Sequence, residues 1–539
     1  MFEIVSKDFL EKDFKSWGTM FPYHCIYILE NGKYAYIGET KDIDIRAKWH
    51  ADNARKTKQK KYKFKKIHII TSTASQESAA KHFEQLLIRL MQADKKFIIL
   101  NIKNERIPYY DDKNKFEGYF DDLWSGLAEI GLVETKDFSA VFNSSVYKYS
   151  PHTDLTEKQV KTLNYIVNSI NSGETESHKE GFEARPILIK GDAGTGKTVV
   201  AVSLFNFLIN SGKYKKEDIA LVYPLKSMRN EIREVFKHTE GLDPKNVVAP
   251  ADITKKRYKI VICDEAHKLR CNNKNLSPFY ISYMKKKNNE MKIDENCDEL
   301  DWFLLQSDCL VLFYDEKQIT ETSGITYESF KERLYIETRG VRPVVLSEQM
   351  RIKAGPEYIS YIYDVLYQRA ENKIKFKDYD LRFFDNFAEM TKLVEGKEKE
   401  EGLCRMCSGY AWEWKAKEDR EKIDISIDEV DIKWNTPAKR WLSNEENKRE
   451  MGSIYTLAGM DLNYAGVVIG PDIYYDVYDD KIKVNKKNYF DKNAKKGIEE
   501  EKLRPYILNL YAVLFTRGIM GTYIYVCDNN LREYFKKYF

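Results

Sequence analysis

A glycine-rich turn that ends in Lys197 and Thr198 is the strongest chemical signal in this sequence. Its glycines let a tight backbone turn present N–H groups to phosphate oxygens. Lys197 is suited to reaching the terminal phosphates, and the Thr198 hydroxyl to binding Mg²⁺. The alternative, a structural glycine-rich turn, would not need the Lys-Thr ending. The predicted nucleotide contacts are Gly191, Gly194, Thr195, Gly196, Lys197 and Thr198.

Asp264 and Glu265 form a second signal, directly after the apolar run 258–263. An acid at the carboxyl end of a strand beside a phosphate-binding loop is suited to holding Mg²⁺, and the next carboxylate to polarising the attacking water. Chance is the alternative for an isolated acidic run, but the preceding apolar strand favours the functional interpretation. The two signals together predict an ATPase site with ATP and Mg²⁺ as cofactors.

Four further polar residues lie near predicted strand or helix ends. Gln159 lies in a helix before the glycine loop and is suited to reading adenine, and Gln318 follows an apolar strand and is suited to sensing the γ-phosphate. Arg351 and Arg517 each come just after an apolar run. Taken alone, each is more often a surface residue, so their assignment depends on their order along the chain.

The N-terminal region begins with two β-rich runs, 25–29 and 34–38, joined by an Asn-Gly pair typical of a hairpin turn. They carry Tyr27 and Tyr36. A helix is expected to follow, and Arg46 and His50, four residues apart, share one of its faces.

Glu84 lies inside the apolar stripe of a helix predicted over 75–93. A carboxylate in that position is costly to bury unless it is paired or holds a cation. The alternative is a glutamate at the helix edge, bonded to Lys81 or Arg89.

Residues 55–66 carry eight Lys or Arg side chains, two aromatic ones and no acid. Such a run is often a solvated loop, but the absence of acids favours a surface that binds a phosphate backbone. The predicted nucleic-acid contacts are Lys58, Lys60, Lys61 and Lys63.

Composition limits the remaining classes of protein. The 539 residues contain 88 Lys+Arg and 84 Asp+Glu, so only local clusters indicate a nucleic-acid partner. Eight irregularly spaced cysteines, a charged N-terminus and the lack of a long apolar window predict a cytoplasmic protein with free thiols and no membrane partner. The pair Cys404 and Cys407 is interpreted as two strand residues because no second pair accompanies it.

The N-terminal residues resemble the GIY-YIG nuclease family in their order and approximate spacing. The resemblance implies that Tyr27 acts as, or helps to position, the general base, with Tyr36 and His50 assisting. The residues that carry it are Cys25-Ile26-Tyr27, Tyr36-Ile37-Gly38, Arg46, His50, Glu84 and Asn101.

The same resemblance implies that Arg46 holds the scissile phosphate, that Glu84 binds one divalent metal, Mg²⁺ or Mn²⁺, and that Asn101 ties the site together. Two residues depart from the family pattern. Cys25 replaces the first glycine, which is expected to alter only strand packing. Glu39 stands where some members carry a lysine, which changes the charge at that position.

The motifs after residue 150 resemble superfamily 1 helicases, most closely the Schlafen-type, helicase-like NTPases of bacteria. The resemblance implies two RecA-like lobes with ATP between them, completed by Arg351 and Arg517 from the second lobe and by Gln159 and Gln318. Ala458-Gly459 stands where the helicase pattern often has Gln-Gly, which weakens processive unwinding more than ATP hydrolysis.

The predicted fold class is α/β, with a small mixed nuclease domain followed by the two parallel-sheet lobes. Within the connector, Phe120, Leu123, Trp124 and Leu127 predict a short helix, and the Lys- and Asn-rich segment 271–299 predicts an insertion or mobile loop. The predicted divisions are a polar leader over 1–19, the nuclease domain over 20–110, an ordered connector over 111–150, lobe 1 with both nucleotide motifs over 151–340, and lobe 2 with the arginine fingers over 341–539.

These predictions favour an ATP-dependent nuclease-helicase that acts on DNA, with a role in phage defence and with RNA as the alternative substrate. Two other functions stay open. One is a non-translocating NTP switch that gates the nuclease, and the other is a nucleic-acid-binding scaffold with a vestigial nuclease.

Overall fold

The computed structural model divides into two compact units, each described by itself. The first comprises residues 1–156, 202–213 and 230–245, and the second comprises the rest of the chain. All eight cysteines have free thiols, and among the described residues no helix has both the length and the apolar surface to cross a bilayer. The described residues are 2–9, 24–72, 77–101, 119–142, 144–151, 153, 155–172, 184–334, 343–417, 419, 421–435, 441–457 and 460–539.

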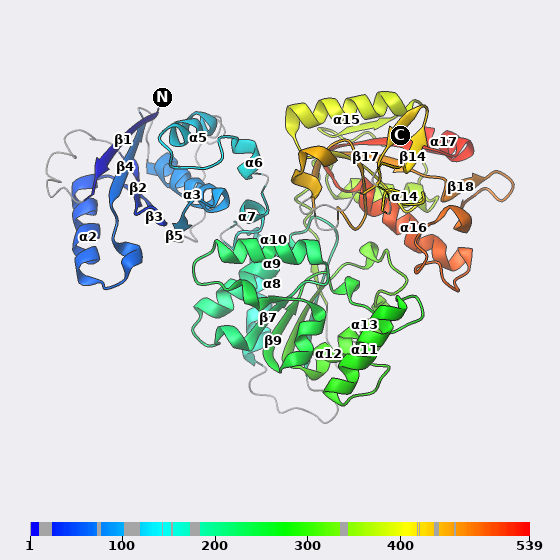
Figure 1. The fold of residues 1–539 in the computed structure, drawn as a ribbon, viewed down its shortest axis with the longest axis horizontal. Coiled ribbons are helices and arrows are strands. Elements are labelled where there is room, and N and C mark those ends of the chain that lie inside the picture. Colours follow the sequence, from blue (N-terminus) through cyan, green and yellow to red (C-terminus); the bar gives the residue numbers. More distant parts are fainter. Residues whose placement is uncertain are drawn as a thin grey trace. The chain divides into compact units, whose positions relative to one another are not determined.

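A five-stranded mixed sheet, in the order β1-β4-β2-β3-β5, forms the centre of the first unit (Figure 1). Helix α2 (Ile43–Lys56) packs on the sheet face that carries Tyr27 and Leu29, and α3 (Glu77–Asp94) lies on the other side. The tight turn between β2 and β3 contains Gly32 at φ +84, a conformation that glycine adopts without strain. The strands are β1 (Phe2–Asp8), β2 (Cys25–Glu30), β3 (Tyr34–Thr40), β4 (Lys66–Ser72) and β5 (Ile98–Ile99).

Strand β1 was not expected, because the sequence placed it in a polar leader. It pairs antiparallel with β4 along its whole length, from Phe2 opposite Ser72 to Asp8 opposite Lys66. It lies at the edge of the sheet, and its residues alternate only loosely between exposed and half-buried positions. The rest of the predicted leader lies outside the described residues.

Three short helices follow the nuclease-like sheet, and they confirm an ordered connector in the part that the structure describes. Helix α5 (Phe120–Glu129) buries the four predicted residues, Phe120, Leu123, Trp124 and Leu127. The Phe120 ring stacks on Phe83 of α3 with ring centroids 5.3 Å apart. The other two helices are α6 (Phe138–Phe142) and α7 (Ser145–Lys148).

The second unit contains two parallel sheets, as predicted for two RecA-like lobes (Figure 1). The lobe 1 sheet has the order β11-β6-β10-β9-β7-β8. Because its strands are parallel, the carboxyl ends of β6, β9 and β10 lie along one edge, where ligands of such sheets bind. The strands are β6 (Arg185–Gly191), β7 (Ile219–Val222), β8 (Val247–Val248), β9 (Tyr258–Cys263), β10 (Ser307–Tyr314) and β11 (Val344–Leu346).

The lobe 2 sheet has the order β12-β20-β17-β13-β16. Every residue of its central strand β17 is buried, as expected for a parallel strand covered on both faces. Cys404 and Cys407 lie buried in β13, as predicted. The strands are β12 (Asp380–Phe383), β13 (Cys404–Ser408), β16 (Met451–Ser453), β17 (Leu462–Ile469) and β20 (Gly518–Val526).

Helices cover both sheets of the second unit and place the predicted motifs. Helix α8 carries Gln159, α9 begins at Lys197, and α16 ends just before Arg517. Two antiparallel hairpins, β14/β15 (Ile425–Ile427 with Val430–Ile432) and β18/β19 (Ile473–Asp476 with Lys481–Val484), are added to lobe 2. The helices are α8 (Glu157–Ser172), α9 (Lys197–Asn210), α10 (Lys226–Lys237), α11 (Pro278–Met291), α12 (Glu299–Leu305), α13 (Tyr327–Arg333), α14 (Pro356–Leu366), α15 (Phe387–Glu401), α16 (Glu500–Phe515) and α17 (Asn529–Lys536).

Segment 271–299 is not the mobile loop that its composition predicted. Ser277 caps α11 by accepting a hydrogen bond from the Tyr280 backbone, and Pro278 occupies the first turn. The buried Asn288 side chain then fixes the return of the chain, because it donates to the carbonyls of Glu295 and Cys297. A polar core residue therefore orders a segment that looks like a solvated loop in the sequence.

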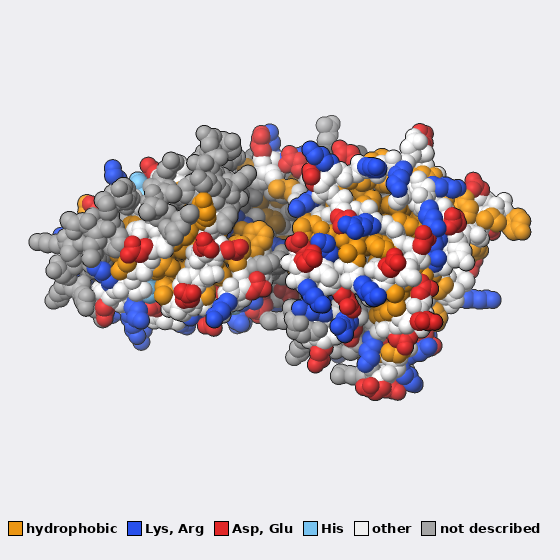
Figure 2. Space-filling view, turned by 90° about the horizontal axis from the view of Figure 1, so that it is seen from above, with side chains coloured by type: hydrophobic (Ala, Val, Ile, Leu, Met, Phe, Trp, Pro, Cys, Tyr) orange, Lys and Arg blue, Asp and Glu red, His pale blue; other side chains and the backbone are white. Residues whose placement is uncertain are grey.

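The surface carries mixed charge. On the face shown in Figure 2, Lys and Arg side chains are interspersed with Asp and Glu side chains among the described residues. This distribution agrees with the net charge of only +4. A surface for nucleic acid would therefore have to be a local cluster of basic side chains and not a field of one sign.

Candidate functional site

The predicted nuclease residues of β2, β3 and α2 meet around the hydroxyl of Tyr27. Tyr27 Oη lies 3.0 Å from His50 Nε2 and accepts a hydrogen bond of 2.9 Å from Arg46 Nε. Arg46 also donates to the Tyr36 hydroxyl at 3.4 Å, and the two tyrosine rings are stacked 6.2 Å apart. One guanidinium therefore connects both tyrosines of the hairpin.

Burial controls the protonation of this cluster. It raises the pKa of Tyr27, which is 1% exposed, with a smaller contribution from Tyr36. Burial, together with the nearby Arg46 charge, lowers the pKa of His50 to about 3. At neutral pH Tyr27 is therefore a phenol, and His50 is a neutral imidazole that can share a hydrogen bond with it.

Asn101 and Gly38 hold the second strand in place around Tyr27. The Asn101 side chain accepts from the Ile37 N–H at 2.9 Å and donates to the Ile37 carbonyl. Gly38 lies directly opposite Tyr27 in the β2–β3 pairing, and a Cβ at this position would lie 2.3 Å from Tyr27 Oη. In the sequence, Gly38 was only one residue of the matched motif. The structure shows that it leaves room for the Tyr27 hydroxyl.

Glu84 lies on α3 and is 1% exposed, so it is not the helix-edge residue of the alternative interpretation. Its negative charge is one of the contributions that raise the pKa of Tyr27. Among the described residues, no group of three His, Cys, Asp or Glu side chains could hold a metal ion. A single buried carboxylate fits a Mg²⁺ or Mn²⁺ ion whose other ligands are water and phosphate oxygens.

The two departures from the family pattern are accommodated locally. Cys25 is buried in the core between the sheet and α2, and burial raises its thiol pKa to about 12. Glu39 lies with a carboxylate oxygen 3.5 Å from His24 Nδ1. Neither residue takes a place among the groups that contact Tyr27 Oη.

The substitution Gly38→Ala is expected to reduce cleavage by about 10²-fold, because the new methyl group displaces the Tyr27 hydroxyl from Arg46 and His50. Single-turnover cleavage of a labelled oligonucleotide measures the effect. Gly396→Ala is the control, since a Cβ there meets nothing within 4 Å. Full activity of the Gly38→Ala protein would show that the position of this hydroxyl is unimportant.

The predicted basic surface is largely present. Lys58, Lys60 and Lys63 are exposed, and the Asn31 side chain anchors their loop by donating to the Lys61 carbonyl at 3.2 Å. Lys61 differs from the prediction, because its ammonium group forms an ion pair with Glu240 of the same compact unit. Its charge is therefore already engaged.

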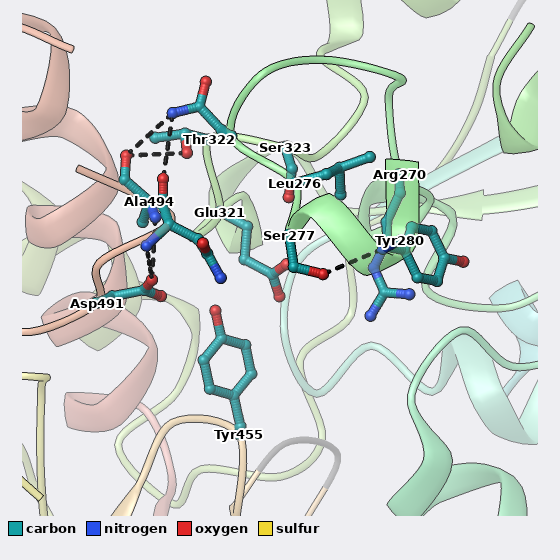
Figure 3. Close-up of a pocket in the computed structure, with 12 residues that line it drawn as sticks. Arg270, Leu276, Ser277, Tyr280, Glu321, Thr322, Ser323, Tyr455, Asp491 and Ala494 are labelled. Atoms are coloured by element: carbon teal, nitrogen blue, oxygen red, sulfur yellow. Dashed lines mark hydrogen bonds between the residues drawn. The ribbon is translucent and has the colours of Figure 1, made fainter. Parts of the chain in front are cut away.

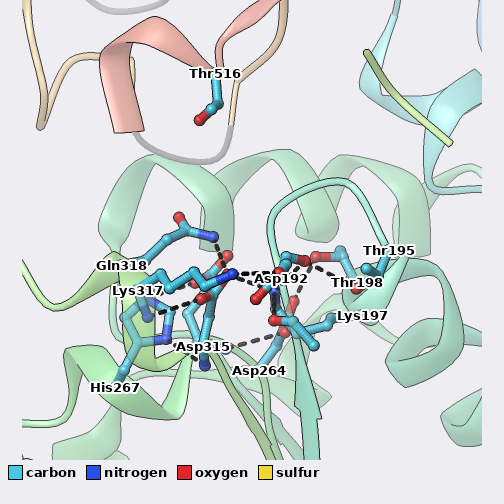
Figure 4. Close-up of polar contacts among 12 residues, drawn as sticks. Asp192, Thr195, Lys197, Thr198, Asp264, His267, Asp315, Lys317, Gln318 and Thr516 are labelled. Atoms are coloured by element: carbon cyan, nitrogen blue, oxygen red, sulfur yellow. Dashed lines mark hydrogen bonds and ion pairs between the residues drawn. The ribbon is translucent and has the colours of Figure 1, made fainter. Parts of the chain in front are cut away.

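Lys197 lies at the centre of the second predicted site (Figure 4). Its ammonium group donates to the carbonyls of Gly191 at 2.7 Å and Asp192 at 3.0 Å, and to Asp315 Oδ2 at 3.0 Å. An ammonium group has three donors, so all three are occupied by the protein. Gln318 also donates to Asp315 Oδ2, at 2.6 Å.

The two acids after β9 have different partners. Asp264 Oδ2 accepts from the Thr198 hydroxyl at 2.6 Å, and burial raises the Asp264 pKa to about 7. Glu265 Oε2 lies 3.0 Å from His267 Nε2. Burial favours the neutral form of Glu265, but His267, Lys197 and Lys268 together outweigh it and the pKa is lowered overall. Glu265 also has φ +54, a strained conformation for a residue with a side chain.

The remaining predicted nucleotide residues border the glycine loop. Gln159 is buried and donates to the Thr195 carbonyl at 3.1 Å. Arg351 follows Met350, whose N–H donates to the Gly194 carbonyl at 3.0 Å. The structure thus brings residues far apart in the sequence to one loop.

The two predicted arginine fingers have different surroundings. Arg351 forms an ion pair of 2.7 Å with Asp461 and donates to the Thr516 carbonyl at 3.2 Å. Arg517 is buried, donates to the Met460 carbonyl at 3.2 Å, and lines a cavity of about 10 Å³. That cavity is also lined by Glu265, Lys268, Gln318 and Tyr455.

A larger cavity, of about 180 Å³, lies on the other side of Tyr455 (Figure 3). Figure 3 shows the Tyr455 hydroxyl pointing toward Glu321, with Asp491 beside it. Tyr455 lines both this cavity and the small one next to Arg517. The other departure noted in the sequence, Ala458-Gly459, lies outside the described residues.

Sequence reasoning missed Asp315 and Asp461. Asp315 follows the apolar strand β10 just as Asp264 follows β9, so the same signal of an acid at a strand end was available. Asp461 has no such signal, because its pairing with Arg351 joins positions 110 residues apart.

Comparisons with known proteins identify two domains in this chain. Residues 185–528 match the model of the Schlafen group 3, DNA/RNA helicase domain, and residues 23–97 match the GIY-YIG catalytic domain. Uncharacterized protein YPL245W of Saccharomyces cerevisiae is 27% identical over 429 residues, which cover 70% of this chain and 90% of that protein.

Solved structures give weaker likenesses. The crystal structure of Pif1 helicase from Candida albicans is 11% identical, with a TM-score of 0.28, over 71% of this chain and 96% of that chain. Mss116p bound to ssRNA and AMP-PNP is 12% identical, with a TM-score of 0.30, over 77% of this chain and 76% of that chain. The helicase model alone matches more than half of the sequence, and the chain therefore belongs to the family of Schlafen group 3 DNA/RNA helicase domains, with a GIY-YIG catalytic domain ahead of the helicase domain.

Proposed function

We propose that this protein is an ATP-dependent nuclease-helicase. The site around Tyr27 would cut DNA, and ATP bound at Lys197 would drive or gate that activity. The observation that carries the nuclease part is the hydroxyl of Tyr27, which lies between Arg46 Nε at 2.9 Å and His50 Nε2 at 3.0 Å. A positive group on one side and a neutral imidazole on the other fix the position of this oxygen, and general acid–base catalysis requires such positioning.

The chemistry of this cluster follows from its protonation states. Tyr27 is a phenol at neutral pH, so its proposed role is to position the attacking water, with its hydroxyl held between Arg46 and the neutral imidazole of His50. Arg46 stabilises negative charge on the tyrosine oxygen and is also placed to bind the scissile phosphate. Tyr36 helps to fix the guanidinium through its hydroxyl.

A divalent ion at Glu84 would stabilise the leaving oxygen and the charge on the phosphate. Glu84 is the residue proposed to hold it, as Mg²⁺ or Mn²⁺. In the nucleotide site, Thr198 and Asp264 would hold Mg²⁺, Lys197 would bind the terminal phosphates, and Glu265 would orient the attacking water. Gln159 and Gln318, with Arg351 and Arg517, are proposed to complete the ATP contacts.

The three hydrogen bonds that Lys197 already makes to the protein support a role for ATP in switching or driving the motor. Phosphate oxygens can bind the ammonium group only by replacing the carbonyls or the Asp315 carboxylate that now surround it. Nucleotide binding therefore rearranges the glycine loop and the segment after β10 together, which is how a motor or a gate begins its cycle.

The test is incubation of wild type and Lys197→Ala with labelled single-stranded, duplex and forked DNA, with Mg²⁺, with and without ATP. We expect the wild type to cut DNA and ATP to change the pattern or rate, and the variant to lose at least about 10²-fold of its ATP hydrolysis and the response to ATP. Wild-type protein that cuts none of the substrates would overturn the nuclease assignment. An ATP response that persists in Lys197→Ala would overturn the coupling.

A non-translocating switch is the second candidate, and one contact favours it. The Met350 N–H donates to the Gly194 carbonyl at 3.0 Å, so the segment that leads from β11 to the second lobe contacts the nucleotide loop directly. Closing the loop on ATP would then move Arg351 without any nucleic acid. Strand displacement separates the two candidates, because only a motor displaces a labelled strand during ATP hydrolysis.

We also propose a cytoplasmic protein that restricts foreign DNA, as in phage defence, on the combination of the two domains alone. RNA is the alternative substrate, and the same assay with labelled RNA tests it. A scaffold with a vestigial nuclease would bind these strands without cutting any of them.

A further inference from the structure

Trp49 is a large aromatic residue that α2 leaves half exposed, at 50%, beside the proposed catalytic cluster. Helix α2 buries Ile43, Ala47 and His50 against the sheet, so Trp49 is not needed for this packing. A single exposed apolar residue is common on protein surfaces, so a ligand for Trp49 has to be inferred from its neighbours. Its position next to His50 places that ligand at the nuclease site.

The Trp49 ring is fixed by residues of the site itself. The Arg46 guanidinium lies 4.7 Å from the ring centroid, and the His50 ring lies 4.8 Å away, edge to face at 84°. The same guanidinium donates to Tyr27 Oη at 2.9 Å. A nucleobase stacked on the exposed part of the Trp49 ring would therefore bring the phosphate of its own nucleotide close to Arg46.

The charge around this ring suits a nucleic acid. Phe64 is buried with its ring 6.3 Å from that of His50, and the lysines on either side of it, Lys63 and Lys65, are exposed. They belong to the same basic run as Lys58 and Lys60, in the segment between α2 and β4. Positive charge beside an exposed aromatic ring is the usual surface for single-stranded nucleic acid.

We infer that Trp49 is a stacking platform for an unpaired nucleobase next to the scissile phosphate, so that the nuclease selects single-stranded or locally unpaired nucleic acid. The inference rests on the proposed nuclease function and names its substrate class. A base pair inside a duplex is stacked on both faces and offers none to Trp49, whereas an unpaired base does. Stacking tolerates any sequence, so the selection is for strand state and not for bases.

Ile45 provides a matched control on the same helix. It is 69% exposed and also apolar, but it has no aromatic face. Trp49→Ala and Ile45→Ala therefore both remove exposed apolar surface from α2, and only the first removes a stacking surface. Trp49→Phe keeps a smaller aromatic face and tests rescue.

The experiment uses the full-length protein without nucleotide. It measures KM and kcat for a single-stranded oligonucleotide and for its duplex, and the fluorescence of 2-aminopurine placed at successive positions of the single strand. We expect Trp49→Ala to raise KM for the single strand by about ten-fold or more, to leave the duplex nearly unchanged, and to lose a 2-aminopurine quenching step seen in wild type. Trp49→Phe should restore part of both effects.

Equal changes for single strand and duplex, or the same changes in Ile45→Ala, would overturn the stacking role. So would quenching that is unaltered in Trp49→Ala, a result that is readable even without cleavage. Wild-type protein that quenches the probe through Trp49 but cuts neither substrate would instead contradict the proposed nuclease function. Thermal unfolding of each variant confirms that the exposed substitutions leave the fold intact.

Discussion

Tyr27→Phe is expected to reduce nucleic-acid cleavage by about 10²- to 10⁴-fold, the range that a positioned acid or base contributes. The substitution removes one oxygen and keeps the ring, which is buried between β3 and α2. The lost oxygen is the atom that contacts both Arg46 and His50. Single-turnover cleavage in excess enzyme measures the chemical step separately from strand binding.

Tyr36→Phe is the matched control, because it also removes one phenolic oxygen from the same hairpin. Its hydroxyl contacts Arg46 at 3.4 Å, a longer and weaker hydrogen bond, so we expect a loss of about ten-fold or less. ATP hydrolysis should be unchanged in both variants, since both residues lie in the first compact unit and Lys197 in the second. Equal losses in the two tyrosine variants would contradict a special role for Tyr27.

The nuclease residues were predictable because hairpin and helix geometry is local. An Asn-Gly turn sets the β2–β3 pairing, and a separation of four places Arg46 and His50 on one face of α2. The steric role of Gly38 was not predictable in the same way. It depends on Tyr27 lying opposite Gly38, with its hydroxyl 2.3 Å from the place of a Cβ, and only the pairing register reveals that.

Some of the nucleotide residues were predictable because they follow an apolar strand. Parallel strands bring their carboxyl ends to one edge, so Lys197, Asp264 and Gln318 had to lie close together. The ion pair between Lys197 and Asp315 adds charge neutralisation, with the two side chains 6% and 1% exposed. Which acid neutralises a buried lysine depends on side-chain reach, and the pattern of strands does not specify it.

The segments that were predicted wrongly are those whose partner is distant in sequence. The sequence of strand β1 predicted a polar leader. The strand forms because it pairs with β4, more than fifty residues later, and the local sequence does not show that partner. The Lys- and Asn-rich composition around helix α11 predicted an insertion or mobile loop. It gave no sign that Asn288 is buried, where its side chain also accepts a hydrogen bond from Trp302 Nε1 at 2.5 Å. The composition of a segment predicts its average exposure to solvent. It does not reveal a single buried polar residue that orders the segment.

Glu265→Gln is expected to lower ATP turnover by about 10²- to 10⁴-fold while nucleotide binding is retained, because the amide keeps the shape of the side chain and loses the basic oxygen. His267 Nε2 lies 3.0 Å from that carboxylate and orients it, and Arg517 and Gln318 line the same small cavity. Steady-state phosphate release and fluorescent-nucleotide binding measure the two effects separately. Glu316→Gln is the control, since Glu316 is a more exposed carboxylate that pairs with Lys190 in the same lobe. A variant that loses nucleotide binding together with turnover would show that Glu265 supports the shape of the site, and a variant with normal turnover would assign the activation of water to another residue.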